Sequence, residues 1–348
     1  AKIRGVVALA GGNALSSRYF YLNAAQQTFN QWVAEQDYAA ICCFSSSMAE
    51  YIFRSELLAK PPEQRPRLVM DFCDVDSDKW RQYAEDATFP MNILYRREYK
   101  ALKAYECRIQ QTFDATVLVS AGEADLFRSQ CADCRALRVI SNGVDHEYFS
   151  PRPPDAAADQ APAPPTLVFT GAMDYPVNIK GVLWFVNQVW PLLRRRYPNL
   201  AFYIVGSNPS TEINALAAQD GITVTGFVDD IRDYYGLADV CIAPLHQGRG
   251  VQNKVLEAMA MGNAVVTTSR ANAGVRGQDR THLLVANSAD DFAAAVAQLL
   301  NSPAQAAAMG QAARDYVVQN FDWNTNMTAL VDLLNADADT SSGRNEGP

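Results

Sequence analysis

The stretch from Pro244 to Val266, PLHQGRGVQNKVLEAMAMGNAVV, decides the fold of the second half of the chain. It follows an apolar run ending at Ala243, opens with a loop that contains Gly248 and Gly250, and continues into strong helix formers, VLEAMAM. A glycine loop between a buried strand and a helix lets a ligand approach free backbone N–H groups at the positive end of the helix dipole. The stretch therefore predicts a strand–loop–helix unit with an anion site at the start of the helix.

Charged side chains of this stretch support that prediction. Arg249 lies in the loop and Lys254 in the first predicted helical turn. Because the helix dipole favours acids at this end, two bases there indicate an anionic ligand such as a diphosphate. Glu257 follows Lys254 by three residues on the same helix face, where its carboxylate could accept hydrogen bonds from both hydroxyls of a ribose. The alternative is a surface ion pair between Lys254 and Glu257, worth less than about 0.5 kcal/mol.

Short apolar runs alternate with helical patterns along the chain. The runs are continuous rather than alternating, which is typical of strands buried on both faces of a parallel sheet. Strands are predicted at Tyr38–Phe44, Arg67–Phe72, Ala115–Val119, Leu137–Ile140, Thr166–Thr170, Leu200–Val205, Ile222–Thr225, Asp239–Ala243, Ala264–Thr268 and Leu283–Ala286. Helices are predicted between them, including Ile179–Arg196, Pro209–Ala218, Ile231–Leu237, Gln252–Met261 and Asp290–Leu300. This alternation predicts an α/β chain with crossover helices.

A proline-rich segment divides the chain. Residues 150–165, SPRPPDAAADQAPAPP, contain six prolines and no apolar periodicity, as in a semi-extended linker. A length of 348 residues fits two domains of roughly 100–200 residues each. We therefore predict two α/β domains, with ligands bound beyond the carboxyl ends of their strands.

Composition excludes several classes of protein. The 30 Lys and Arg against 38 Asp and Glu give a net charge of −8, which argues against general nucleic-acid binding. No apolar run approaches the roughly 20 residues of a membrane span. Seven cysteines, an odd number, favour a reducing cytoplasm over a secreted disulfide framework. Cys131 and Cys134 form a lone CxxC, which we interpret as ordinary thiols rather than zinc ligands.

Several segments resemble one family in the right order. KVLEAMAMGNAVV resembles the K-x-x-E-A-M-A-x-G-x-P-V-V signature of family-4 retaining glycosyltransferases. Ser141–Pro151 (SNGVDHEYFSP) resembles the connector between their domains, Phe169–Asn178 (FTGAMDYPVN) their glycine loop, and Thr225–Asp230 (TGFVDD) the loop beside the nucleotide base. The segments DFCDVDSDKW, FSSSMAEY and RGVQNKVLEAMAM resemble the sugar transferases found with bacterial exosortase and exopolysaccharide systems.

The resemblance implies the GT-B fold, in which two Rossmann-like, doubly wound parallel-sheet domains face each other across a cleft. Residues 1–149 would form the acceptor-side domain, 150–165 the linker and 166–320 the nucleotide-sugar domain, with a helix at 321–335 packing back on the first domain. The enzyme would move a sugar, with retention, from a UDP- or GDP-type nucleotide-diphosphate sugar to a saccharide or lipid-linked acceptor. It would require no cofactor and would work in the cytoplasm, with peripheral contact at the inner face of the membrane.

The resemblance also assigns roles in the donor site. Lys254 would bind the donor diphosphate, with Arg249 beside it, and both would stabilise charge on the leaving diphosphate, while Glu257 would hold the ribose. Further donor contacts would come from Gly171, Val228, Gly250, Val251 and Gln252.

Two departures from the family pattern stand out. Many relatives carry a first glutamate eight residues before the second, but counting back from Glu257 gives Arg249, so recognition of the donor sugar differs. The segment YAAICCFSSSMAEY also follows the start of the chain sooner than in relatives. We therefore expect a truncated N-terminal domain that lacks several dozen residues.

Four acids crowd the end of a predicted strand in DFCDVDSDK. Asp71 and Asp74 are candidates to orient an acceptor hydroxyl or to act as a base. The alternative is a helix start that favours acids, with Asp76 or Ser77 as its N-cap. The DVD triplet resembles a metal-binding motif of a different glycosyltransferase fold, so we expect no required metal.

Leu94–Ile109, LYRREYKALKAYECRI, is predicted as a basic, tyrosine-rich amphipathic helix. Such a helix can lie on an anionic membrane, but an ordinary solvated face is the alternative. Two other functions also remain open at this point: a nucleotide-sugar 2-epimerase of the same fold, and a binder of nucleotide sugars without catalytic activity.

Overall fold

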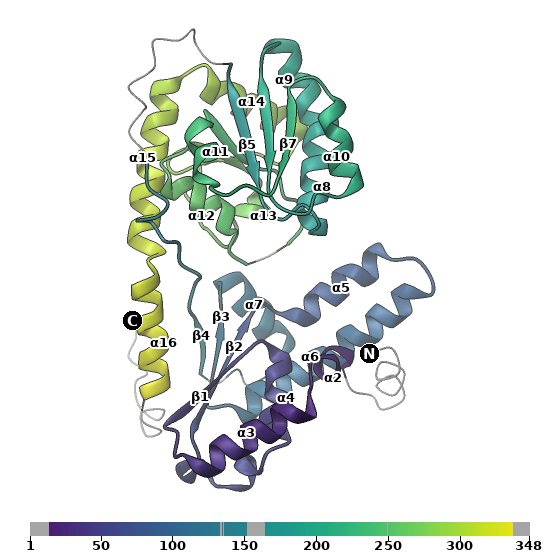
Figure 1. Cartoon of the computed structure of the whole chain (residues 1–348), viewed down its shortest axis with the longest axis vertical. Helices are drawn as coiled ribbons and strands as arrows, with labels where there is room; N and C mark the ends of the chain where they lie inside the picture. The colour runs from purple at the N-terminus through teal and green to yellow at the C-terminus, as the bar shows by residue number, and fades with distance from the viewer. Residues whose placement is uncertain (1–13, 133, 135, 152–163, 249, 337–348) are drawn as a thin grey trace. The chain divides into compact units, whose positions relative to one another are not determined.

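The computed structural model describes residues 14–132, 134, 136–151, 164–248 and 250–336 (Figure 1). The chain divides into two compact units. The first runs up to Ser141 and includes the residues from Met327 onward, and the second runs from Asn142 to Asn326. Most of the predicted linker, residues 152–163, lies outside the described residues.

The first unit is built on a parallel sheet of four strands in the order β1-β2-β3-β4. The strands are β1 (Ala40–Phe44), β2 (Arg67–Cys73), β3 (Ala115–Leu118) and β4 (Leu137–Val139). The α-helices that precede or connect them are α2 (Leu15–Tyr19), α3 (Asn23–Glu35), α4 (Ala49–Phe53), α5 (Asp76–Asp86), α6 (Met91–Thr112) and α7 (Ala121–Gln130). Because all four strands are parallel, their carboxyl ends lie along one edge, where loops can carry functional side chains.

The last described helix, α16 (Trp323–Asn335), ends in the first unit. Its Leu330, Leu333 and Leu334 pack against a small buried cluster on the first sheet, formed by Val69 of β2 with Ala115 and Val117 of β3. Arg67 also donates from Nε to the carbonyl of Leu333 at 2.9 Å. The chain therefore completes the first unit with residues from both halves of its sequence.

The second unit contains a parallel sheet of six strands in the order β10-β9-β8-β5-β6-β7. The strands are β5 (Thr166–Thr170), β6 (Ala201–Val205), β7 (Ile222–Gly226), β8 (Val240–Ala243), β9 (Val265–Thr267) and β10 (Leu284–Val285). Its α-helices are α8 (Pro176–Trp184), α9 (Trp190–Arg196), α10 (Thr211–Ala215), α11 (Arg232–Leu237), α12 (Asn253–Ala260), α13 (Ser269–Asn272), α14 (Ala289–Leu300) and α15 (Pro303–Asn320). Within the described residues, no helix combines the length and apolar character needed to span a bilayer.

The predicted fold class is confirmed by these two parallel sheets. All ten predicted strands are present, with ends that differ by at most two residues. The predicted helix Ile179–Arg196 is interrupted by a π-helical turn at Phe185–Val189. Pro191 at the start of α9 explains the interruption, because proline has no N–H to continue the preceding helical hydrogen-bond ladder.

The interpretation of Cys131 as an ordinary thiol was wrong. Cys131, at the end of α7, forms a disulfide with Cys107 of α6, and their Cα atoms are 5.3 Å apart. The two cysteines are 24 residues apart in sequence, and only the packing of the two helices brings them together. Cys134 of the same CxxC lies outside the disulfide, and its thiol donates to the carbonyl of Cys131 at 3.2 Å.

Candidate functional site

Bare backbone forms the carboxyl edge of the second sheet. Gly171 follows β5 and Gly206 follows β6, both with φ near +148°, a conformation that side-chain-bearing residues rarely adopt. A Cβ on Gly206 would lie 1.8 Å from the carbonyl oxygen of Gly171, so the two loops touch through their backbones. The end of β7 joins them, because Gly206 donates its N–H to the carbonyl of Gly226, the last residue of that strand, at 3.2 Å. A ligand at this edge would therefore meet peptide groups rather than side chains.

Lys254 brings a positive charge to the first of these glycines. It lies in the first turn of α12, and its Nζ donates to Oδ1 of the buried Asn178 at 2.6 Å. The same Nζ lies 4.2 Å from the ring centroid of Phe169 and would be 2.8 Å from a Cβ on Gly171. The absence of a side chain at Gly171 thus leaves room beside the ammonium group. Asn178, which we did not single out from the sequence, fixes the position of that group.

The surroundings of Lys254 lower its pKa to about 7, because loss of solvation disfavours the charged form more than the attraction of Glu257 restores it. The ammonium group is held beside an aromatic ring and an amide rather than by a carboxylate. An anion that entered this site would supply the missing negative charge and would favour the protonated form of Lys254.

Glu257 takes part in a second buried polar chain. Its Oε2 accepts a hydrogen bond from the hydroxyl of Tyr235 at 2.9 Å, and that hydroxyl lies 2.9 Å from Oγ1 of Thr170. Burial raises the pKa of Glu257, while the Tyr235 hydrogen bond and the charge of Lys254 act in the opposite direction. Lys254 and Glu257 each bind a partner of their own, so the alternative of a simple surface ion pair does not describe them.

Three of the remaining predicted donor residues come directly before α12. Gly250, Val251 and Gln252 lead into α12, and the N-cap residue Gln252 makes no side-chain hydrogen bond to the N–H groups of the first turn. A Cβ on Gly274 would lie 2.1 Å from the carbonyl oxygen of Gly250, so this loop packs directly on another backbone segment. Val228 is half-buried in the loop after β7. Arg249 lies outside the described residues.

The acidic loop of the first unit follows β2. The strand register is irregular between Asp71 and Cys73, and Cys73 has a φ of +63°. Asp71 accepts the Cys73 N–H at 2.9 Å, and burial raises the pKa of Asp71, with a smaller contribution from the charge of Asp74. Lys79 lies 3.3 Å from Asp74 and 3.0 Å from Asp76. The raised pKa gives Asp71 the character of a base, whereas the carboxylate of Asp74 forms an ion pair with Lys79.

The alternative interpretation of the acidic stretch, in which Asp76 or Ser77 caps the helix, was wrong in its choice of cap. The N-cap is Val75, and neither Asp76 nor Ser77 caps the helix through its side chain. Two buried glutamates bind the helix start instead: Glu123 accepts the Val75 N–H at 2.8 Å, and Glu106 accepts the Ser77 N–H at 3.0 Å and its hydroxyl at 2.6 Å. Burial raises the pKa of Glu106 to about 8. These carboxylates hold the acidic loop in place from within the first unit.

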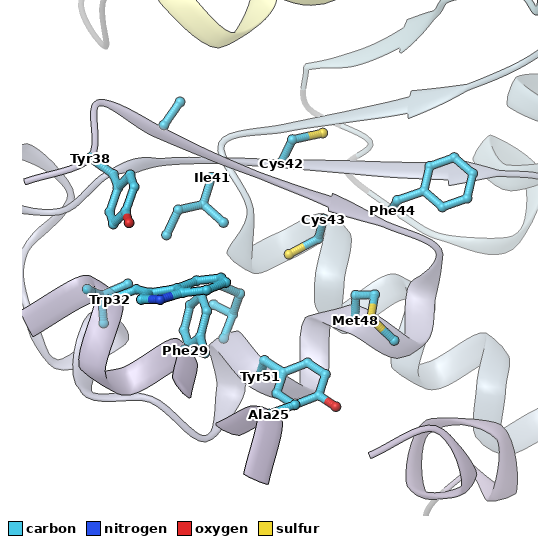
Figure 2. Close-up of a pocket in the computed structure, with 13 residues that line it drawn as sticks. Ala25, Phe29, Trp32, Tyr38, Ile41, Cys42, Cys43, Phe44, Met48 and Tyr51 are labelled. Carbon is cyan, nitrogen blue, oxygen red and sulfur yellow. The ribbon is translucent and has the colours of Figure 1, made fainter. Parts of the chain in front are cut away.

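An apolar pocket of about 470 Å³ lies elsewhere in the first unit, between α3 and β1 (Figure 2). Its walls are mainly aromatic and sulfur-containing, with Phe29 and Trp32 from α3 facing Ile41 and Cys43 of β1. None of the predicted site residues lines it.

Binding of a nucleoside diphosphate is expected to weaken as the pH rises from about 7.5 to 9, by at most about tenfold per pH unit. The reason is that Lys254, with a pKa near 7 in the free protein, is mostly neutral in this range and must take up a proton to pair with the diphosphate. Calorimetry in two buffers with different ionisation enthalpies would detect that uptake. Lys254→Met should abolish it, and persistence of the uptake in this variant would contradict the assignment to Lys254.

Comparisons with known proteins show what the second unit resembles. Residues 164–302 match the family model described as glycosyl transferases group 1. Over 249 residues the chain is 32% identical to the GDP-mannose-dependent alpha-(1-6)-phosphatidylinositol monomannoside mannosyltransferase of Mycobacterium tuberculosis. That alignment covers 66% of this chain and 64% of the relative, so the chain spans just under two thirds of the length of this relative.

Two solved structures are similar over most of the chain. Sucrose-phosphate synthase from Thermosynechococcus elongatus has a TM-score of 0.70 at 20% identity, covering 88% of this chain and 76% of that one. HepE from Anabaena, solved in complex with UDP, has a TM-score of 0.67 at 15% identity, covering 89% of this chain and 81% of that one. At these identities the likeness concerns the fold, and it confirms the predicted GT-B class.

Proposed function

Because residues 164–302 match the model of group 1 glycosyltransferases, we propose that this protein transfers a sugar from a nucleotide-diphosphate sugar to a hydroxyl group of an acceptor. The observation that carries the proposal is the arrangement at the start of α12. There Lys254 reaches the bare backbone at Gly171, and Glu257 lies three residues further along the same helix. A cation beside exposed peptide groups suits a diphosphate, and a carboxylate one turn away suits a ribose.

In the proposed reaction the second unit binds the donor. Lys254, with Arg249, stabilises the negative charge that develops on the leaving diphosphate, and such preorganised electrostatics is usually the largest catalytic contribution. The backbone of Gly250, Val251 and Gln252 offers further N–H donors, and the loop of Val228 meets the base. The donor is of the UDP or GDP type: the mycobacterial relative is named for GDP-mannose and HepE was solved with UDP. No cofactor is part of the proposal.

The first unit is proposed to bind the acceptor. Asp71 and Asp74 would orient the acceptor hydroxyl, which belongs to a saccharide or to a lipid-linked sugar. Support comes from the position of the acidic loop at the carboxyl end of β2 and from the raised pKa of Asp71. Three further parts of the proposal rest on the sequence motifs. The transfer would proceed with retention of configuration, the product would belong to exopolysaccharide synthesis alongside exosortase systems, and the protein would work in the cytoplasm at the inner face of the membrane.

Incubation with UDP- and GDP-sugars is expected to give transfer to an added acceptor with release of the nucleoside diphosphate. A donor that binds only the folded protein should first raise the melting temperature, since a ligand at a hundred times its Kd adds about 2.7 kcal/mol to stability. Product analysis separates the alternatives. A 2-epimerase would change the sugar without an acceptor, and a binder would show the thermal shift without products. Absence of a shift with every nucleoside diphosphate would contradict the proposal.

A further inference from the structure

The α5–α6 helical hairpin extends away from the sheet of the first unit (Figure 1). Its tip, residues 87–93, together with the last turns of α5, exposes an unusual set of large apolar side chains. The exposed fractions are 76% for Phe89, 59% for Ile93, 43% for Tyr83 and 42% for Met91. Single exposed apolar residues are common on proteins, but several at the end of one projecting element mark an interaction surface.

Aromatic rings hold this tip in place. Trp80 and Tyr83 of α5 and Tyr95 of α6 pack together, with ring centroids 5.5 to 6.1 Å apart. Tryptophan and tyrosine combine an apolar ring with a polar atom, and they are the residues enriched where proteins meet the boundary between water and lipid.

The acidic and basic side chains of α6 lie in different environments. Its two acids are buried and bind backbone groups of other elements: Glu98 accepts the N–H groups of α2, and Glu106 accepts the Ser77 N–H at the start of α5. Four of its five bases lie at the surface, with Arg96, Lys100 and Arg108 exposed and Lys103 half-exposed, whereas Arg97 is partly buried and its Nη1 lies 3.8 Å from the carboxylate of Glu98. Within α6, the surface charge is therefore entirely positive, although the chain as a whole carries −8. The exposed acids beside the tip, Glu85 and Asp86, lie at the end of α5, where Glu85 pairs with Arg81 at 2.6 Å.

The apolar tip and the basic face are continuous. Ile93, Arg96 and Lys100 are spaced by three and four residues, so they lie along one side of α6 that begins at the tip. An apolar patch followed by a row of cations complements a bilayer with anionic headgroups, where the first enters the boundary with the acyl chains and the second pairs with phosphates. A protein partner would have to combine an apolar groove for the tip with acidic side chains for the basic face. An anionic membrane offers an apolar interior and negatively charged headgroups over its whole surface.

We infer that the α5–α6 hairpin docks this protein on an anionic lipid surface, with Phe89, Met91 and Ile93 in the headgroup boundary and the basic face of α6 over the lipid phosphates. The inference rests on the proposed function only in explaining what docking would achieve, because a lipid-linked acceptor would be located in the membrane. The docking itself requires neither the donor nor the acidic loop.

Co-flotation with vesicles tests the inference on the full chain. We expect binding to phosphatidylcholine vesicles that contain about 30% phosphatidylglycerol, weak binding to pure phosphatidylcholine, and release at high salt, because the Debye length shortens to about 3 Å at 1 M. Phe89→Ser with Ile93→Ser, and separately Arg96→Glu with Lys100→Glu, should each lower the partition coefficient about tenfold or more, since each basic residue near such a surface is worth about 1 kcal/mol.

Matched controls come from exposed positions of the second unit. Leu237→Ser, at a residue that is 59% exposed, and Arg195→Glu on α9 should leave flotation unchanged. All variants should keep the circular dichroism spectrum of the parent. Equal loss in the controls, no flotation of the parent, or equal binding to neutral vesicles would overturn the inference. A second result would also overturn it. If the Phe89→Ser, Ile93→Ser variant still floated with the vesicles but had a different molar mass from the parent by light scattering, the tip would be an interface between protein molecules.

Thermal shifts with nucleoside diphosphates keep this test separate from the proposed function. Hairpin variants should retain the shift of the parent, because the substitutions lie in the first unit and the donor residues in the second. A parent that floats without any nucleotide shift would contradict the transferase and leave the docking intact. The opposite result would contradict the docking alone.

Discussion

Replacement of Lys254 by alanine is expected to lower the turnover of sugar transfer by about a hundredfold or more, which corresponds to roughly 3 kcal/mol of transition-state stabilisation. Asn178 and Phe169 hold Nζ of Lys254 in place before any ligand arrives. Once the bound diphosphate has favoured protonation of Lys254, the ammonium group needs no reorganisation when further charge builds on the leaving diphosphate. Its benefit is therefore largest in the transition state. The measurement is kcat and kcat/KM with saturating acceptor and a varied donor.

Two further variants sharpen this prediction. Lys254→Met keeps most of the side-chain volume against Phe169 but removes the charge, so it should be as slow as Lys254→Ala while folding more normally. Arg195→Ala, an exposed cation on α9 of the same unit, should remain within about twofold of the parent. A Lys254→Met enzyme with near-parental turnover would show that the charge has no part in catalysis and that the residue is only a packing element.

The sequence was most informative where local pattern determines structure. Continuous apolar runs such as Thr166–Thr170 are typical of strands buried on both faces of a parallel sheet, and this pattern located the strands of both units. Glycines before a helix with a basic first turn indicated where an anion could bind, and the structure brings Gly171 and Lys254 together as neighbours. These features depend on residues close in sequence or on a pattern repeated along the chain.

Side-chain partners from distant segments could not be predicted in this way. Asn178 is 76 residues from Lys254, and Tyr235 is 22 residues from Glu257, so neither spacing indicates a contact. Glu106 and Glu123 gave no signal as supports of the acidic loop, because a buried glutamate is identified only once its backbone partners are known. The Cys107–Cys131 disulfide was missed for the same reason, since it depends on how two helices end beside each other.

Replacement of Glu257 by alanine is expected to weaken binding of a nucleoside by about 1.5–3 kcal/mol, or roughly ten- to a hundredfold in Kd, because it removes charge-assisted hydrogen bonds to the ribose. A nucleoside without phosphates should show the same loss as the diphosphate. Lys254→Ala should differ, leaving the nucleoside unaffected and weakening only ligands that carry the diphosphate. Calorimetry with a nucleoside and its diphosphate on both variants measures these four affinities.

The hydrogen bond between Tyr235 and Glu257 provides the control for this prediction. Tyr235→Phe removes the hydroxyl that holds the carboxylate, at 2.9 Å in the parent, but leaves the carboxylate itself available to a ribose. We therefore expect a loss of about 0.5–1.5 kcal/mol in nucleoside binding, smaller than that of Glu257→Ala. Equal losses in the two variants would mean that Glu257 acts by ordering Tyr235 and Thr170 rather than by touching the ligand. Unchanged affinities for nucleoside and diphosphate in the Glu257 and Lys254 variants would reduce the start of α12 to a structural feature, and would remove the main support for donor binding at this site.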